Sequence, residues 1–177
     1  LDRVEYLARL VDQIQQYGQQ SMMNTRMIDI SKILPSIVNV AHKMLGLPNN
    51  FISLEVNVPN DLPVLMLDNQ GFRSVLDEII KNAVRAMPKG GVLSVEAFTN
   101  KVGAYEEFIV IAVKDTGVGI SAEDLMNIYD PFFTTHGRAN AKGLGLSMAK
   151  GIVEQHGGWI QVSSVKGKGT EVRINFP

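Results

Sequence analysis

The chain has 177 residues, 45% of them hydrophobic, which is enough for one domain with a substantial core. Seventeen basic and eighteen acidic residues leave a net charge of −1, so bulk electrostatic attraction to nucleic acid or to a membrane surface is not expected. There is no cysteine, which excludes disulfides and thiolate metal sites and suits a reducing compartment.

The chain begins with Leu1 rather than methionine, and no apolar run approaches the roughly 20 residues of a membrane helix. We therefore expect a cytoplasmic piece of a longer protein, with room for a signal peptide or membrane anchor upstream.

Residues 1–20 carry apolar side chains at alternating steps of three and four, the spacing of a helix with one apolar stripe. The stripe consists of Leu1, Val4, Leu7, Val11 and Ile14. Two interpretations stay open: the helix folds back on the domain, or it belongs to a helical bundle. Residues 21–32 are polar and predict a turn-like connection.

Three further helices are predicted. The first is capped by Ser31 and runs to about Leu45, with Pro35 tolerated in its first turn; the second follows Asp68 and ends near Met87; the third spans about 144–156. Strands are expected at 51–58, 92–99, 107–114, 159–164 and 170–176. Because the last two strands form a hairpin and the middle two adjoin, we expect an α/β two-layer sandwich: a mixed, mostly antiparallel sheet with helices on one face.

The helical segment DEIIKNAVRAM (77–87) carries a polar stripe of Glu78, Asn82 and Arg85, opposite its apolar side. The asparagine carbonyl suits Mg²⁺ where phosphates already supply negative charge. Taken alone, the same stripe also fits an ordinary solvated helix face.

The segment VKDTGVGI (113–120) is a strand that ends in Asp115 and continues into Gly117 and Gly119. Glycines let a ligand approach the backbone closely, although a tight turn after a strand gives the same pattern. A dinucleotide-binding fingerprint is rejected, because the third glycine is missing and the motif comes late in the chain.

Two more motifs follow. YDPFFTT (129–135) places Phe132 and Phe133 before a polar loop, either as core residues or as an anchor for a mobile segment. KGLGLS (142–147) leads glycines into a helix whose free amides suit a phosphate, with Lys142 adding positive charge. It lacks the G-x-x-x-x-G-K-[ST] pattern of a P-loop.

In this order and spacing the four segments resemble the ATP-binding catalytic domain of sensor histidine kinases. This family shares a superfamily with gyrase, a heat-shock chaperone, MutL-type repair proteins and mitochondrial dehydrogenase kinases. KNAVRAM is similar to its N box, DTGVGI to its G1 box, DPFFTT to its F box and KGLGLS to its G2 box. The resemblance covers roughly residues 30–177 and is nearest to the nitrogen-regulation group.

The resemblance implies a Bergerat-type sandwich with Mg-ATP between the core helices. Asp115 would accept a hydrogen bond from the adenine amino group, Gly117 and Gly119 would let the base and ribose approach, and Asn82 would bind Mg²⁺. Arg85 and Lys142 would be candidates for phosphate contact, and residues 134–142 would form a lid. The remaining implied nucleotide contacts are Ile120, Phe133, Thr134, Thr135, Gly143, Leu144, Gly145, Leu146 and Ser147.

Glu78 departs from the asparagine that many histidine kinases carry one turn before the magnesium-binding one. Two roles stay open: a base that activates water, or a group that orients metal-bound water or assists transfer. We favour the second.

The phosphoacceptor histidine is also missing, because none of His42, His136 and His156 is followed by an acid. His42 resembles an ordinary helix residue, and His156 stands where a helix end favours a partial positive charge. Residues 1–20 resemble the end of the second helix of the dimerisation bundle, with 21–30 as linker and 31–177 as the ATP-binding domain.

The predicted function is therefore a histidine kinase fragment. It would transfer the γ-phosphoryl of ATP to a histidine on a bundle helix, for relay to a response regulator, in a homodimeric parent. Contacts with nucleic acid or with a membrane are not expected of this fragment. The alternatives are an ATP-hydrolysing clamp that uses Glu78, and a module that senses ATP without transfer.

Overall fold

The computed structural model describes residues 23–44, 51–102, 106–134 and 143–177. The predicted helix at 1–20 and the site residues Thr135 and Lys142 lie outside these ranges. No helix in the described ranges is long and apolar enough to cross a membrane.

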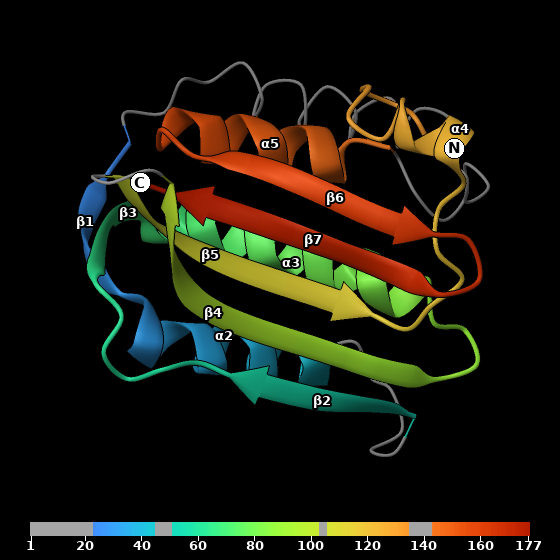
Figure 1. Cartoon of the computed structure of the whole chain (residues 1–177), viewed down its shortest axis with the longest axis horizontal. Coiled ribbons are helices and arrows are strands. Elements are labelled where there is room, and N and C mark those ends of the chain that lie inside the picture. Colours follow the sequence, from blue (N-terminus) through green and yellow to red (C-terminus); the bar gives the residue numbers. More distant parts are fainter. Residues whose placement is uncertain (1–22, 45–50, 103–105, 135–142) are drawn as a thin grey trace, which may run out of the picture.

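Five strands form the main sheet, in the order β2-β4-β5-β7-β6. The strands are β2 (Ile52–Asn57), β4 (Gly91–Val102), β5 (Glu106–Asp115), β6 (Trp159–Val165) and β7 (Gly169–Phe176). Only β2 and β4 are parallel; the other neighbouring pairs are antiparallel. The long helices α2 (Ile30–Met44), α3 (Asn69–Arg85) and α5 (Gly145–Gln155) all lie on one face of this sheet (Figure 1). The predicted two-layer sandwich is confirmed.

The central helix α3 shows why these residues form this layer. Asp68 caps it by accepting a hydrogen bond from the Gln70 amide at 3.1 Å. Its apolar positions recur at helical spacing and are all buried, and α3 contacts both α2 and α5. The crossing with α5 is close, since a Cβ on Gly71 would lie 3.1 Å from Cγ2 of Ile152. The G2-box helix is thereby held against the N-box helix.

The turn-like connection predicted at 21–32 is wrong in part. Residues 25–29 form a strand, β1 (Thr25–Asp29), which pairs antiparallel with β3 (Val64–Asp68). Ile28 and its partner Leu65 are buried, whereas the neighbouring pair Met27 and Met66 faces out. The segment contributes one buried side chain, too few for a recognisable alternation, and its pairing partner lies far along the chain.

The start of the next helix also differs from the prediction. Helix α2 begins at Ile30, so Ser31 is its second residue and not its cap. Pro35 is the sixth residue of the helix rather than part of its first turn, and it removes the amide that would bond the Ser31 carbonyl. A short unpredicted helix, α4 (Ala122–Leu125), follows β5 and is capped by Ser121.

Candidate nucleotide-binding site

The predicted site residues gather at one end of the sandwich. The second half of α3, the end of β5 and the start of α5 all lie at the right of Figure 1, beside α4 and the β6–β7 turn. The N, G1, F and G2 boxes, which are consecutive in the sequence, therefore face a common region.

Asp115, the last residue of β5, is only 5% exposed. Its Oδ1 accepts hydrogen bonds from the amides of Gly117 at 2.8 Å and Thr170 at 3.2 Å. Burial raises the pKa of this carboxyl above its usual value, and the two backbone bonds oppose that rise. Among the described residues Oδ2 has no hydrogen-bond partner, and it is not fully enclosed, so one carboxylate oxygen is available to a ligand.

The loop after Asp115 is pressed against α3 on one side and against the β6–β7 turn on the other. The Val118 amide donates to the Ala86 carbonyl at 2.9 Å, and a Cβ on Gly117 would lie 2.5 Å from that same oxygen. Gly119 has φ +64° and abuts the carbonyl of Val165. These two positions therefore require glycine, the first for space and the second also for its backbone conformation.

The β6–β7 hairpin completes this corner, and the sequence analysis missed it. Besides the bond from Thr170 to Asp115, the Gly167 amide donates to the Val118 carbonyl at 2.7 Å. The Ile120 amide donates to Oγ of Ser164 at 2.8 Å. The sequence predicts KGKGT (166–170) only as a connection between strands. Its one hint of a further role is a threonine directly after a glycine-rich turn.

Glu78, on the polar stripe of α3, lies against the start of α5. Oε2 of Glu78 lies so close to Gly145 that a Cβ there would collide with it, and Oε1 lies 3.3 Å from Nζ of Lys81. Asn82 and Arg85 are exposed, and neither side chain makes a hydrogen bond or ion pair with the described residues. Both are therefore available to a ligand.

The amino end of α5 has no side-chain cap among the described residues. Its cap residue Leu144 makes no side-chain cap hydrogen bond, and its first turn contains no acidic residue. The Ser147 hydroxyl donates to the Leu144 carbonyl at 2.9 Å, so this hydroxyl is already engaged.

The two ends of the predicted lid are joined. The Phe132 amide donates to the Gly143 carbonyl at 2.7 Å, and the Phe133 amide donates to the Asp130 carbonyl at 3.1 Å. The F box, which includes Phe133 and Thr134, is thereby fixed directly beside the G2 box. The other implied lid contacts, Thr135 and Lys142, lie outside the described residues.

The donor set also fits the way Mg²⁺ is held with a nucleotide. The described residues contain no group of three or more histidine, aspartate or glutamate side chains that could hold a metal ion. Mg²⁺ commonly takes one or two protein ligands and completes its shell with phosphate and water. The exposed Asn82, four residues after Glu78, fits that arrangement, whereas an all-protein metal site among these residues does not.

The family model described as "Histidine kinase-, DNA gyrase B-, and HSP90-like ATPase" matches residues 67–177. The chain belongs to this ATPase family. The ATP-binding catalytic domain that the four boxes predicted is thus confirmed.

Relatives of this ATPase domain include sensor kinases. The chain is 32% identical over 173 residues to the sensor histidine kinase ZraS of Escherichia coli O157:H7, and the alignment covers 97% of this chain and 35% of that protein. It is 31% identical over 182 residues to the sensor kinase CckA of Brucella abortus, covering 96% and 19%. The chain thus spans about a third or less of these relatives.

The fold agrees with solved structures. The catalytic domain of the histidine kinase ThkA has a TM-score of 0.72 at 21% identity, covering 88% of this chain and 96% of that one. The narrower resemblance to the nitrogen-regulation group stays a prediction.

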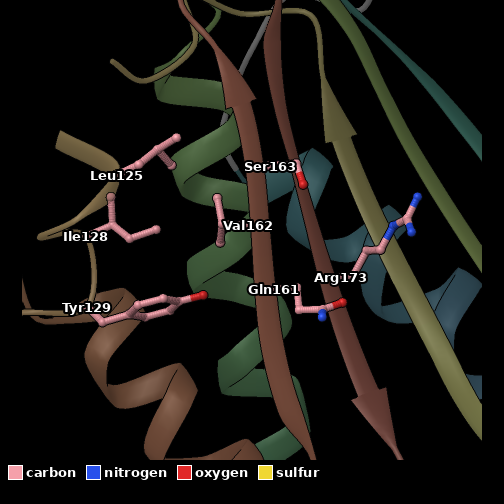
Figure 2. Close-up of a pocket in the computed structure, with 7 residues that line it drawn as sticks. All are labelled: Leu125, Ile128, Tyr129, Gln161, Val162, Ser163 and Arg173. Carbon is pink, nitrogen blue, oxygen red and sulfur yellow. The ribbon is translucent and has the colours of Figure 1, made fainter. Parts of the chain in front are cut away.

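A separate hollow lies beside the edge strand β6 of the ATPase domain. Its lining consists of Leu125, Ile128, Tyr129, Gln161, Val162, Ser163 and Arg173 (Figure 2). Tyr129 fixes the segment before the F box, since its hydroxyl donates to the Ile160 carbonyl at 3.1 Å and Nζ of Lys150 lies 4.9 Å from its ring centre. None of the lining residues is a predicted nucleotide contact.

His156 differs from the expectation of a partial positive charge. Its Nε2 lies 2.9 Å from the Asp68 amide, which can only donate, so that nitrogen carries no proton. Its Nδ1 lies 2.7 Å from the Ile152 carbonyl and must be the donor. The ring is therefore a neutral bridge from the end of α5 to the start of α3.

Proposed function

We propose that this domain binds Mg-ATP and transfers the γ-phosphoryl group to a histidine on a helical bundle of the same protein, for relay to a response-regulator aspartate. The observation that carries the proposal is the common position of Asp115, Asn82 and the uncapped amino end of α5, in a member of the histidine kinase-like ATPase family. Base, metal and phosphates each have a matching group at this end of the sandwich.

Each site residue then has a defined task. Asp115 accepts the adenine amino hydrogen through Oδ2, and the amides of residues 143–147 hold phosphate oxygens. The Asn82 carbonyl binds Mg²⁺, and Arg85 and Lys142 supply positive charge to the phosphates. ATP supplies the phosphoryl group, so the work of the protein is positioning and charge stabilisation.

The lid contributes exclusion of water. Residues 134–142 close over the phosphates, with Phe133, Thr134 and Thr135 at the F-box end. The bond between the Phe132 amide and the Gly143 carbonyl supports this assignment, because it holds the residues that flank the proposed lid beside each other. Ile120 borders the base.

Glu78 supports a second candidate function. Its Oε2 abuts the start of α5, so it can reach a water near the phosphates, as an ATP-hydrolysing clamp requires. We prefer a role in orienting metal-bound water or assisting transfer, because a neutral imidazole acceptor is already a nucleophile. A module that senses ATP without transfer remains the third candidate.

The wider context is part of the same proposal. Residues 1–20 form the end of the second bundle helix. The linker predicted at 21–30 is shorter, because β1 (Thr25–Asp29) pairs with β3, and Ile28 and Ile30 lie in the core of the ATP-binding domain. The relatives are named sensor kinases, and we propose for the parent protein a homodimer with a phosphoacceptor bundle and a response-regulator partner. We place the fragment in the cytoplasm without nucleic acid or membrane contacts.

A phosphotransfer assay tests the proposal. Labelled ATP is given to this chain with and without a bundle domain that carries the acceptor histidine. We expect acid-labile label on the supplied bundle and little on the chain itself. Stoichiometric labelling of His42, His136 or His156 would contradict the missing-acceptor argument.

Two variants in the same assay separate the candidate functions. Glu78→Gln keeps the shape and hydrogen-bond acceptor but not the base, and should retain transfer within about tenfold. Asn82→Ala removes a metal ligand and should lose both nucleotide binding and transfer. If Glu78→Gln is as inactive as Asn82→Ala while it still binds ADP, Glu78 is a catalytic base.

A further inference from the structure

Glu78 brings a negative charge to the helix end that is proposed to hold phosphate. Its Oε2 lies against Gly145, the first residue of α5, so closely that a Cβ on that glycine would collide with it. The Glu78 side chain is 35% exposed and therefore lies between α5 and solvent. The carboxylate and the proposed phosphate donors, the amides of residues 143–147, thus share one end of one helix.

Lys81 compensates this charge only in part. Its Nζ lies 3.3 Å from Oε1 of Glu78, whereas Oε2 is the oxygen that lies against Gly145. The ion pair therefore turns its negative end toward α5. Because the lysine side chain is 40% exposed, water screens the pair, and such a pair contributes little. Glu78 thus keeps much of its effect on a neighbouring anion.

The amino end of α5 favours one anion, and a second anion there meets repulsion. The free amides and the dipole of a helix start stabilise a nearby negative charge. Glu78 already supplies such a charge, so a phosphate held by these amides has a carboxylate as its neighbour. The repulsion grows with the charge on the nucleotide. Because Mg²⁺ cancels two negative charges of a diphosphate, it removes most of this repulsion.

We propose that Glu78 is a specificity-determining residue, which selects metal-bound nucleotides over metal-free ones by repelling unneutralised phosphate at the amino end of α5. The proposal rests on the proposed binding of nucleotide phosphates at this helix. It goes beyond the orientation of metal-bound water, because the repulsion acts on a nucleotide that carries no metal. The two roles therefore predict different changes in binding.

Glu78→Gln removes the charge and keeps the shape of the side chain. We expect metal-free ADP to bind this variant about three- to tenfold more tightly than it binds the wild-type chain, the effect of one partly screened charge. The affinity for Mg-ADP should change by less than about threefold, because the metal has already neutralised most of the phosphate charge. The preference for Mg-ADP should therefore fall because binding of the metal-free form improves.

Glu154→Gln is the matched control. Glu154 lies on the same helix, about 14 Å further along its axis than Gly145, and its carboxylate is also paired with a lysine, Lys150, at 3.8 Å. The substitution therefore removes the same charge from a similar ion pair, but far from the amino end of α5. It should leave both ADP affinities unchanged.

The experiment is a calorimetric titration of the full chain with ADP at constant ionic strength, once with Mg²⁺ and once with a chelator. Adenosine, which carries no phosphate, is the third ligand and should bind the wild-type chain and Glu78→Gln equally. Thermal unfolding checks that each variant is folded. If Glu78→Gln does not fold, Glu78→Ala, which also removes the charge, replaces it.

Three outcomes would overturn the proposal. In the first, metal-free ADP binds Glu78→Gln no more tightly than it binds Glu154→Gln; a preference lost only through weaker Mg-ADP binding would leave Glu78 the metal-water role alone. In the second, adenosine gains as much affinity as metal-free ADP, which would place the change in the base site. Both leave the proposed function intact. In the third, the wild-type chain binds neither form of ADP, which refutes the proposed function as well.

Discussion

Asp115→Asn is the sharpest test of the base site, because it removes a charge and almost no volume. In the wild-type chain Oδ1 accepts the amides of Gly117 and Thr170. An asparagine can keep both bonds only if its amide oxygen takes the Oδ1 position. The amide NH₂ group then stands where Oδ2 stood and points a donor at the adenine amino group.

The expected loss follows from that geometry. One charge-assisted hydrogen bond is worth about 1.5–3 kcal/mol, and every 1.4 kcal/mol is a factor of about ten in affinity. ADP should therefore bind about ten- to a hundredfold more weakly. Folding stability should be unchanged or higher. Both backbone hydrogen bonds survive, and the variant no longer buries a carboxylate, whose charge burial disfavours, as the raised pKa of Asp115 indicates.

The assay pairs calorimetric titration with thermal unfolding, and Asp115→Ala is the comparison. Alanine leaves the amides of Gly117 and Thr170 without their acceptor, at a cost of about 1–3 kcal/mol. For a chain of this size each kcal/mol lowers Tm by about 2–4 °C. Unchanged ADP affinity in Asp115→Asn would remove Asp115 from the site, and a loss of stability as large as that of Asp115→Ala would refute the amide orientation.

Two further predictions concern the same corner. Gly117→Ala should lower Tm and weaken ADP binding, because the added Cβ would meet the Ala86 carbonyl. Gly151→Ala in α5 is the control: its Cβ would meet open space, and the free energy of unfolding should rise by about 0.5–1 kcal/mol. Equal effects of the two variants in thermal unfolding and ADP titration would refute the packing argument. ADP affinity should fall as the pH drops from about 7 through the raised pKa of Asp115, above the ordinary 3.8, because binding needs the ionised form. Folding stability depends on pH in the opposite direction. The stabilising contribution of Asp115 is fully present below pH 3.8 and is lost as the pH rises through the raised pKa of the folded state. Asp115→Asn should lack both trends and therefore controls for titration of the nucleotide itself. If that variant loses ADP affinity at low pH as the wild-type chain does, Asp115 is not the titrating group.

The sequence by itself determined the long elements and the four boxes, because both are local patterns. The repeat of buried positions along α3 and the cap at Asp68 are set by residues a few positions apart, so they are readable without a fold. Asp115, Gly117 and Gly119 were likewise visible as a strand followed by glycines.

The tertiary structure alone decided the parts that depend on distant segments. The strand β1 exists through its pairing with β3, and the proton on His156 is set by an amide 88 residues away. The same holds for the base corner, where Thr170 reaches Asp115 across 55 residues. A hydrogen bond between residues so far apart leaves no periodicity in the sequence, because only the folded sheet brings its donor and acceptor together.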